Sequence, residues 1–535
     1  MPSGALLSDK SRKPVNDSRP SNFPEDEMSE PVLTLRLRQE DDVAVARSDI
    51  LPNTPLPQEA VTTRERIPRG HKVALKAIAA GAPVRKYGQI IGVAQQAIAP
   101  GEHVHVHNLA MAEFERDYAF CDDARPLDFV PQEQRASFLG YRRANGSAGT
   151  RNYLGILTTV NCSATVARAI AARFNPEVLA AYPNVDGVVA LTHGTGCGMA
   201  DSGEGFANLQ RVLWGYARHP NFAGVLLVGL GCEVNQIPFL LDAYGLQPGP
   251  LFQTITIQET GGTRRTIEAG VERLMDMLPL ANEARRSEIP AAELSVALQC
   301  GGSDAYSGIT ANPALGAAVD LLVRHGGTGV LSETPEIYGA EHLLTRRAIT
   351  RDVGERLVDL IHWWEDYTRR NGAQLNNNPS PGNKAGGLTT ILEKSLGAAA
   401  KGGTTNLVDV LHYAELIRKP GFNFMDSPGY DPASVTGQVA AGCQLVCFTT
   451  GRGSVSGFKP APTIKLATNT PMYRRMEEDM DMNCGEIADG EATVEEMGER
   501  LFQLFLETAS GKQTKSELFD FGDNEFVPWQ IGATV

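Results

Sequence analysis

The chain has 535 residues, of which 42% are hydrophobic and 21% are charged, and its formal net charge is -14. This length is too great for one hydrophobic core and predicts about three domains. The acidic balance argues against nucleic acid as a partner, because a phosphate backbone requires a basic surface. No apolar stretch reaches about 18 residues, so we expect no membrane segment.

The first 30 residues are polar and rich in Ser and Pro, without the apolar core of a secretory signal. They predict a disordered tail (1–30) ahead of a cytoplasmic protein. The 8 cysteines are scattered and do not form a disulfide framework. In a reducing cytosol their thiols are available for metal binding or catalysis, although a single Cys is more often a small buried apolar residue.

Short segments of β type separated by Pro, Gly and Asn run from residue 31 to about 112. Regular short strands with turn residues between them predict a small all-β module at 31–112. Residues 113–137 are charged, proline-bearing and aperiodic, and they predict a linker.

From about residue 138 apolar runs alternate with helical stretches, a rhythm that predicts mainly parallel sheets flanked by helices. We expect one α/β domain at 138–285 and a second at 286–535, divided by the proline-terminated segment MDMLPLANEARRSEIPAAE. In the first domain three apolar runs end at Cys162, Cys197 and Cys232, which are 35 residues apart. That is about the length of one strand-helix unit.

Cys300 ends a fourth apolar run, SVALQC, which opens into the polar, glycine-rich loop GGSDAYSG. In open parallel sheets the ligand crevice lies outside the carboxyl ends of the strands, where all four cysteines are expected. Thiolates suit Fe or Zn, as does the imidazole of His193 in HGTGC, and Asp304 adds a hard oxygen. Without a CxxC pair the spacing alone is a weak metal signal, and strand ends can also simply tolerate Cys.

The segment GEHVHVHN places His103, His105 and His107 on one face of a strand, because side chains alternate with period two. They could form a comb of metal ligands, together with His71 at the start of another strand. The alternative is a set of surface histidines on an edge strand.

Two Gly-rich loops, NPSPGNKAGG and TTGRGS, contain Lys384 and Arg452. Backbone amides in such loops can approach an anion closely, and Arg can bind a carboxylate through two hydrogen bonds. Neither loop matches a Walker motif or GxGxxG, so we expect no bound nucleotide or nicotinamide cofactor.

Taken together, several blocks strongly resemble the altronate and galactarate dehydratase family of sugar-acid dehydratases: YRRANGSAGTRNYLGILTTVNC, HGTGCG, VGLGCE, LQCGGSDAYSGITANPALG, SETPEIYGAEHLL, NPSPGNKAGGLTTILEKSLG and TTGRGS. The resemblance extends from about residue 31 to the C-terminus. It implies an α/β fold in which a small N-terminal β-rich SAF-like domain precedes two α/β domains with mainly parallel sheets. It also implies the removal of water from a polyhydroxy acid to give a 2-keto-3-deoxy acid.

The family resemblance implies a divalent metal, usually Fe2+, with Mn2+ as a substitute and a labile iron-sulfur cluster as an alternative if three thiols hold the iron. Together with the residues it leads to a hypothesis for the site. The expected metal ligands are Cys162, His193, Cys197, Cys300, His71, His103 and His105. The expected substrate-binding residues are Ser303, Asn383, Lys384 and Arg452. The expected catalytic residues are His193, Asp304 and Lys384, since a base must take a carbon-bound proton and an acid must protonate the leaving hydroxyl.

Within the family, GEHVHVHN, PEIYGAEHLL and NPSPGNKAGG favour D-altronate as the substrate, with 2-keto-3-deoxy-D-gluconate as the product. One alternative is D-galactarate, and another is a sulfo-lyase acting on a sulfolactate-like acid, whose relatives usually carry the small domain on a separate chain. A sugar-acid sensor without turnover is a third. We expect a homo-oligomer, most simply a dimer.

Overall fold

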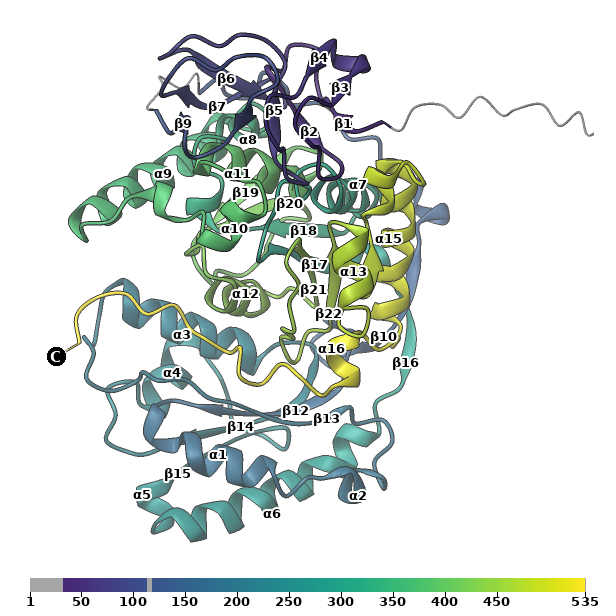
Figure 1. Ribbon diagram of the computed structural model, residues 1–535. Helices are drawn as coiled ribbons and strands as arrows, with labels where there is room; N and C mark the ends of the chain where they lie inside the picture. The colour runs from purple at the N-terminus through teal and green to yellow at the C-terminus, as the bar shows by residue number, and fades with distance from the viewer. Residues whose placement is uncertain (1–31, 113–117, 535) are drawn as a thin grey trace, which may run out of the picture.

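The computed structural model describes residues 32–112 and 118–534 (Figure 1). The predicted tail, residues 1–30, lies outside the described residues. A small β-rich module is followed by an α/β region at the opposite end of the molecule, and a larger α/β region lies between the two (Figure 1). This arrangement confirms the predicted fold class. No described helix combines the length and apolar character needed to cross a membrane.

The N-terminal module is built from short antiparallel strands joined by turns. One sheet has the order β1-β2-β5-β8, a second has the order β6-β7-β9, and β3 pairs with β4. The strands are β1 (Thr34–Leu35), β2 (Val43–Ala46), β3 (Pro55–Leu56), β4 (Val61–Thr62), β5 (Lys72–Ala74), β6 (Pro83–Lys86), β7 (Gln89–Ala94), β8 (His103–Val104) and β9 (Leu109–Ala110). Part of the module's core also packs against Ala340, Leu396 and Ala399 of the large region, so the module is docked on that region.

Four parallel strands form the sheet of the second region, in the order β13-β12-β14-β15. They are β12 (Tyr153–Thr158), β13 (Gly187–Leu191), β14 (Phe222–Gly229) and β15 (Phe252–Thr256). The helices are α1 (Ala164–Ala171), α2 (Pro176–Leu179), α3 (Glu204–Ala217), α4 (Ile237–Tyr244), α5 (Ile257–Thr260) and α6 (Thr263–Asn282). Helices α1 and α6 cover the outer face, and α3 lies between this sheet and the C-terminal region (Figure 1).

An antiparallel ribbon joins the second region to the C-terminal region. Strand β10 (Ser137–Arg142) pairs on one side with β11 (Ala148–Gly149) and on the other with β16 (Arg286–Pro290). The chain therefore enters and leaves the second region through neighbouring strands. The predicted boundary at 285/286 falls at the start of β16.

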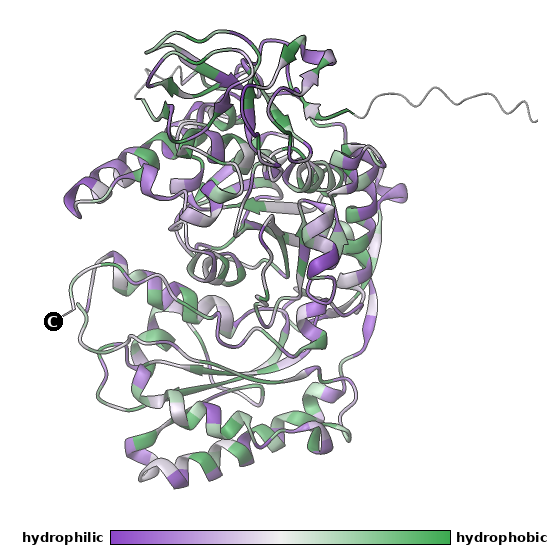
Figure 2. Cartoon of the chain, viewed as in Figure 1, coloured by the Kyte–Doolittle hydropathy of each residue, from purple (hydrophilic) through white to green (hydrophobic). Residues whose placement is uncertain are grey.

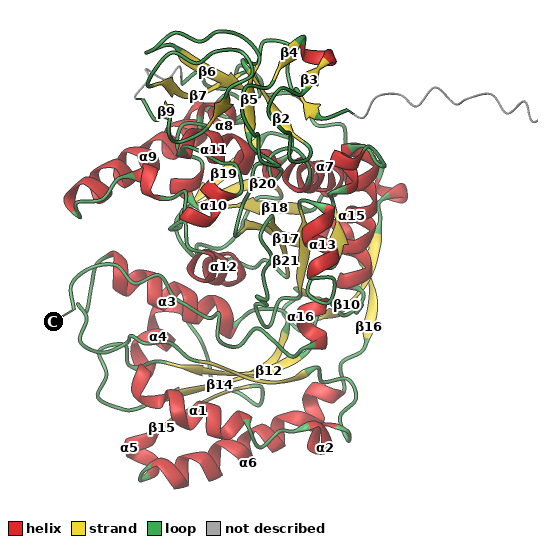
Figure 3. Cartoon of the chain, in the orientation of Figure 1, coloured by secondary structure: helices red, strands yellow, loops and turns green. Residues whose placement is uncertain are grey.

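The C-terminal region contains a sheet of seven parallel strands in the order β19-β20-β18-β17-β21-β22-β23. They are β17 (Ser295–Cys300), β18 (Thr328–Leu331), β19 (Leu407–Leu411), β20 (Gly421–Met425), β21 (Leu445–Thr450), β22 (Thr463–Ala467) and β23 (Met482–Asn483). The helices are α7 (Ala311–Arg324), α8 (His342–Thr345), α9 (Arg351–Arg370), α10 (Pro381–Ala385), α11 (Ile391–Ala399), α12 (Asp431–Ala440), α13 (Thr470–Arg475), α14 (Glu486–Asp489), α15 (Val494–Ala509) and α16 (Lys515–Leu518). Figure 3 shows these helices enclosing the strands.

The strand order creates a switch point beside β17. The chain leaves β17 for β18 on one side and later returns to β21 on the other. In parallel sheets the loops at such a point diverge and leave a crevice at the carboxyl ends of the strands. The loop that follows Cys300 begins there.

The two α/β regions share one hydrophobic core, because buried residues of α3 and of the seven-stranded sheet belong to the same cluster. The close packing of α3 on α12 requires Gly215, where a Cβ would collide with the carbonyl oxygen of Ala440. Outer helices such as α6 and α9 mix hydrophilic and hydrophobic residues along their length (Figure 2). In α9 the buried positions Val353, Leu357, Ile361 and Trp364 recur at the spacing of one helical face.

Candidate active site between the small module and the large sheet

The loop after β17 begins with two glycines because neighbouring side chains occupy the space that larger residues would need. A Cβ at Gly301 would collide with Oδ2 of Asp431, which opens α12. Gly302 has φ +62, and a Cβ there would press on Arg452. The strand therefore opens into a loop that two other segments can approach closely.

The carboxylate of Asp304 anchors this loop. Its Oδ1 accepts hydrogen bonds from the backbone nitrogens of Tyr306 and Ser307 at 3.1 and 2.9 Å and from Oγ1 of Thr468 at 3.0 Å. Its Oδ2 accepts a hydrogen bond from Asn469 at 3.1 Å. Burial raises the pKa of Asp304, and the hydrogen bonds oppose that shift. In this conformation the side chain holds the loop in place, and its predicted role in proton transfer stays a prediction.

Of the four predicted substrate-binding residues, Ser303 belongs to this loop, and the other three lie on segments beside it. Nδ2 of Asn383 donates to the carbonyl oxygen of Ser303 at 2.8 Å, while Asn383 also caps the start of α10. Lys384 follows in α10, and Arg452 lies beside Gly302. Within the part of the chain that the structure describes, neither cationic head group of Lys384 or Arg452 has a hydrogen-bond or ion-pair partner. Both are therefore available to an anion.

Three histidines of the small module converge at the edge of α10. His71 Nδ1 and His103 Nε2 are 2.9 Å apart, and one ring nitrogen from each of His71, His103 and His105 lies within 4.8 Å of the others. His71 Nε2 donates to the carbonyl oxygen of Ala385 at 3.3 Å, next to Lys384. The strand pairing of β5 with β8 brings the two sequence segments together.

The histidine set suits a divalent transition metal. Burial, followed by mutual repulsion of the histidines, lowers the pKa of His103 to about 3, and burial lowers that of His105 to about 4. The rings are therefore neutral near pH 7, as metal ligands must be. Nδ1 of His105 is buried without a partner among the described residues, and His71 donates its second nitrogen to a carbonyl as metal-bound histidines commonly do.

A buried ion cluster docks the histidine module on the large sheet. Nζ of Lys72 lies 2.9 Å from Glu393 Oε2, and Nζ of Lys86 lies 2.9 Å from Glu393 Oε1. Burial alone would raise the pKa of Glu393, but the two ammonium groups lower it well below its usual range. Lys72 also donates to the carbonyl oxygen of Gly387 at 2.7 Å. The cluster thereby fixes His71 beside α10.

A second buried cluster surrounds Cys300 and was not predicted from the sequence. Nζ of Lys401 lies 2.9 Å from Cys300 Sγ and 3.8 Å from Glu333 Oε2. Glu336 lies 3.6 Å from the same sulfur and pairs with Lys394 at 2.6 Å. Glu333 lies just after the end of β18, in the same way that Cys300 lies at the end of β17. This position at a strand end is the sequence signal from which Glu333 could have been predicted.

Burial gives this second cluster unusual acid-base properties. It raises the pKa of Cys300 to about 11 and that of Asp431 to about 7, and it raises the pKa of Glu333 well above its usual range. Both carboxylate oxygens of Glu333 lack a hydrogen-bond partner among the described residues. Burial would also raise the pKa of Glu336, but Lys394 and Lys401 lower it. The cluster therefore combines proton carriers with fixed cations.

The remaining predicted metal ligands lie elsewhere. Cys162 and Cys197 are exposed on loops of the second region. His193 is buried, donates from Nε2 to the carbonyl oxygen of Thr158 at 2.8 Å, and accepts from the backbone nitrogen of Thr195 at Nδ1. Among the described residues, three potential ligand atoms converge in two places, the histidine set and Cys300 with Glu333 and Glu336. The structure thus divides the predicted metal ligands among three places.

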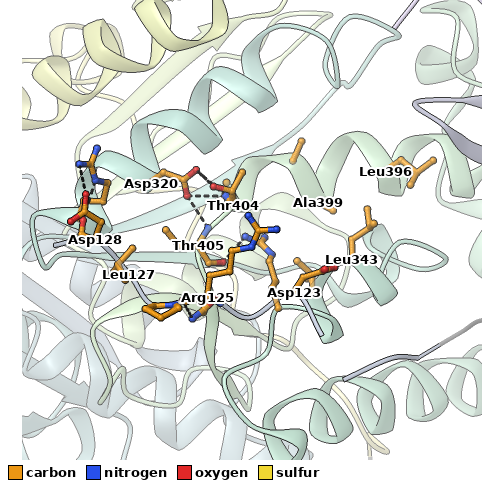
Figure 4. Close-up of a pocket in the computed structure, with 17 residues that line it drawn as sticks. Asp123, Arg125, Leu127, Asp128, Asp320, Leu343, Leu396, Ala399, Thr404 and Thr405 are labelled. Carbon is orange, nitrogen blue, oxygen red and sulfur yellow. Dashed lines mark hydrogen bonds and ion pairs between the residues drawn. The ribbon is translucent and has the colours of Figure 1, made fainter. Parts of the chain in front are cut away.

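One cavity beside the C-terminal sheet is not part of this arrangement. It measures about 580 Å³ and is lined by Asp123, by residues 125–128 and by segments that include Asp320 and Thr404 (Figure 4). It lies at the amino ends of β18 and β19, the edge of the sheet opposite Cys300. Asp320 is already bound by the backbone nitrogens of Thr404 and Thr405 at 2.8 and 3.1 Å.

Three family models match consecutive parts of the chain. "Altronate/galactarate dehydratase SAF domain" matches residues 32–112, and "D-galactarate dehydratase/Altronate hydrolase, second domain" matches residues 140–282. "D-galactarate/Altronate dehydratase, C-terminal" matches residues 291–534. The β-rich module with its histidines and the large parallel sheet with its polar crevice thus define a sugar-acid dehydratase, and the chain belongs to the altronate/galactarate dehydratase family.

Curated relatives extend this similarity over almost the whole chain. Altronate dehydratase of Bacillus subtilis is 37% identical over 510 residues, covering 94% of this chain and 99% of that protein. Altronate dehydratase of Escherichia coli is 38% identical over 506 residues, again covering 94% and 99%. Galactarate dehydratase (L-threo-forming) of Escherichia coli is 39% identical over 487 residues, covering 90% and 93%. These identities are too similar to choose between the two substrates.

Proposed function

We propose that the protein removes water from a sugar acid. The preferred substrate is D-altronate, and the product is 2-keto-3-deoxy-D-gluconate. The observation that carries the proposal is the convergence of His71, Lys384 and Arg452 around the loop 301–308. A polyhydroxy acid offers a carboxylate for the two cations and hydroxyl oxygens for a metal. The names of the full-length relatives support the same reaction.

The cofactor proposed is Fe2+, held by His71, His103 and His105, with Mn2+ as a substitute. Imidazole suits iron among several divalent transition metals, and the family resemblance selects iron among them. When bound, such a cation stabilises the negative charge that develops on a substrate as the proton next to its carboxylate is removed. Lys384 and Arg452 would hold the carboxylate and share that charge. The free head groups of these two residues support this role.

Proton transfer requires a base for the carbon-bound proton and an acid for the departing hydroxyl. Asp431 suits the role of base, because a pKa of about 7 lets a carboxyl group gain and lose a proton near neutrality. Glu333 suits the role of acid, because burial keeps its carboxyl group protonated. The roles predicted for His193 and Asp304 stay open to substitution experiments.

The test is an anaerobic screen of hexonates and hexarates, with sulfolactate included, in the presence of ferrous iron. We expect 2-keto-3-deoxy product from D-altronate. Turnover of D-galactarate alone would show that the proposed substrate is wrong and the reaction class is right. Release of sulfite from sulfolactate would show that both the substrate and the reaction class are wrong. Tight binding of sugar acids without product would identify a sensor and overturn the enzyme assignment.

A homodimer and a cytoplasmic location are further proposals that rest on the family resemblance. Light scattering of the purified chain tests the first, and fractionation of the source cells tests the second. A monomeric mass at micromolar concentration would contradict the dimer.

A further inference from the structure

The three cysteines of the second region occupy equivalent places on adjacent strands. Thr158 of β12 pairs with Val228 of β14, and Cys162 and Cys232 each follow four residues later. Cys197 follows the end of β13, the neighbour of β12 on its other side. The three thiols therefore project from consecutive loops at one edge of the sheet.

Hydrogen bonds tie these loops into one unit. The backbone nitrogen of Asn161 donates to the carbonyl oxygen of Thr195 at 2.9 Å, which joins the first and second loops. The backbone nitrogen of Asn235 donates to the carbonyl oxygen of Gly196 at 3.1 Å, which joins the second and third. Oγ1 of Thr159 donates to Glu233 at 2.6 Å, which joins the first and third. The relative positions of the three loops are thus fixed by the fold.

Two glycines beside the cysteines allow close contacts, one between the first two loops and one between the third loop and α5. Gly196 has φ +102, and a Cβ there would collide with the carbonyl oxygen of Thr159. Gly231 has φ +123, and a Cβ there would press on Gln258. Both glycines immediately precede an exposed cysteine, Cys197 and Cys232.

The exposure of these thiols separates them from the structural cysteines of the same chain. Cys162, Cys197 and Cys232 are all exposed, whereas Cys300, Cys443, Cys447 and Cys484 are buried. Free Cys ranks among the most often buried residue types, so three exposed thiols on adjoining loops require an explanation other than packing. Nε2 of Gln258 already donates a hydrogen bond to Cys232 Sγ at 3.2 Å, the kind of contact that stabilises a thiolate.

We propose that Cys162, Cys197 and Cys232 hold an iron-sulfur cluster on the second region. A single ion requires three ligand atoms close together, and among the described residues these sulfurs do not form such a group. A four-iron cluster binds each thiolate through a different iron and so suits ligands that are spread over three loops. Binding releases the three thiol protons.

Three protein ligands leave one iron of a four-iron cluster free to bind an oxygen of water or substrate, much as catalytic metal sites keep one position open. The cluster site rests on the loops alone and is separate from the histidine set, to which the proposed function assigns the metal used in dehydration. Asn235 supports a ligand site in these loops, because its buried Oδ1 has no partner among the described residues.

The test is anaerobic reconstitution of the full chain with ferrous iron and sulfide. We expect about four sulfides per chain, together with the visible charge-transfer absorption of a cluster. Cys162→Ser, Cys197→Ser and Cys232→Ser should each lose the bound sulfide and the absorption. Cys121→Ser is the matched control, because its thiol lies on a different segment, and it should retain both.

Alkylation of the wild-type protein provides a measurement that does not depend on variants. The reconstituted protein should protect Cys162, Cys197 and Cys232 from alkylation and leave Cys121 as reactive as in the untreated protein. Iron bound without acid-labile sulfide, or equal labelling of the three thiols before and after reconstitution, would overturn the proposal. Neither result bears on turnover with ferrous iron alone, so failure of the cluster site and failure of the proposed function are distinguishable.

Discussion

Nζ of Lys401 lies 2.9 Å from Sγ of Cys300, and both side chains are buried at the carboxyl end of β17. Burial raises the pKa of the thiol to about 11, so near pH 7 it is neutral. Burial would lower the pKa of Lys401, but the thiol and the acids Glu333 and Glu336 raise it, so the lysine stays charged. The crevice beside β17 therefore contains a permanent positive charge.

Lys401→Met should be destabilising, because it removes one of the two cations that lower the pKa of the buried Glu336. We expect a loss of about 3–5 kcal/mol in the free energy of unfolding. Urea unfolding followed by the fluorescence of Trp363 and Trp364 measures it. Lys76→Met is the control, since its ammonium group is largely exposed beside Asp42 and should contribute at most about 1 kcal/mol. Equal changes in the two variants would show that Lys401 is not the compensating charge.

Asp431 predicts a pH dependence of turnover. Its carboxyl group is protonated below about pH 7 and ionised above it. Only the ionised carboxylate can act as a base, so kcat/KM should rise as the pH increases through about 7 and should be constant at higher pH. Asp431→Asn should remove that limb and lower the rate by about 10²- to 10⁴-fold. Asp352→Asn, on the exposed side of α9, should leave the profile unchanged, and an unchanged profile in Asp431→Asn as well would assign the base elsewhere.

Glu393 predicts that acid releases the small module. Its pKa in the folded protein lies below the ordinary value of 4.5, so its contribution to stability is complete above about pH 4.5 and is lost as the pH falls below that value. The protection factors of the amides in β5 and β7, which compare each exchange rate with the intrinsic rate at the same pH, should therefore fall in acid. Glu393→Gln should produce the same fall at pH 7, because Lys72 and Lys86 then face each other without a carboxylate. Glu40→Gln, an exposed change in the same module, should exchange like the wild type.

Arg452 should act on the substrate and contribute little to stability. Its head group has no partner among the described residues, so Arg452→Gln removes only a contact with the substrate carboxylate. A charge-assisted hydrogen bond contributes about 1.5–3 kcal/mol, so kcat/KM should fall by roughly 10- to 150-fold with an unchanged melting temperature. Arg264→Gln, on the exposed face of α6, is the control. A loss of stability without a loss of kcat/KM would argue for a structural role.

The sequence contained enough to find the histidine set and the strand-end cysteines. The alternation of His103 and His105 is a local pattern, and His71 follows a glycine turn, so both features can be read without a fold. The placement of cysteines at strand ends was also local. The assignment of each strand end to a sheet cannot be predicted locally. Cys300 and Cys162 have the same local pattern but follow strands of two separate sheets.

The cluster around Cys300 shows what local patterns cannot supply. Lys401 and Glu333 reach the thiol from segments that are far apart in the chain, and each lies in an ordinary context, one at the end of a helix and one after a strand. Their proximity arises from the packing of α11 and the turn after β18 around β17. Only the tertiary structure reveals that these groups are buried, and burial is what shifts their pKa values.

His105 supplies the sharpest test of the histidine set, because its Nδ1 is buried without a partner among the described residues and so has no structural hydrogen bond to lose. His105→Ala should weaken the binding of ferrous iron by at least about tenfold. Anaerobic titration with ferrous iron, in a protein whose second-region thiols are alkylated, measures this site alone. His107→Ala is the matched control, since His107 is exposed two residues further along and outside the converging set. Identical iron affinities for the two variants would show that the histidine set does not bind the metal.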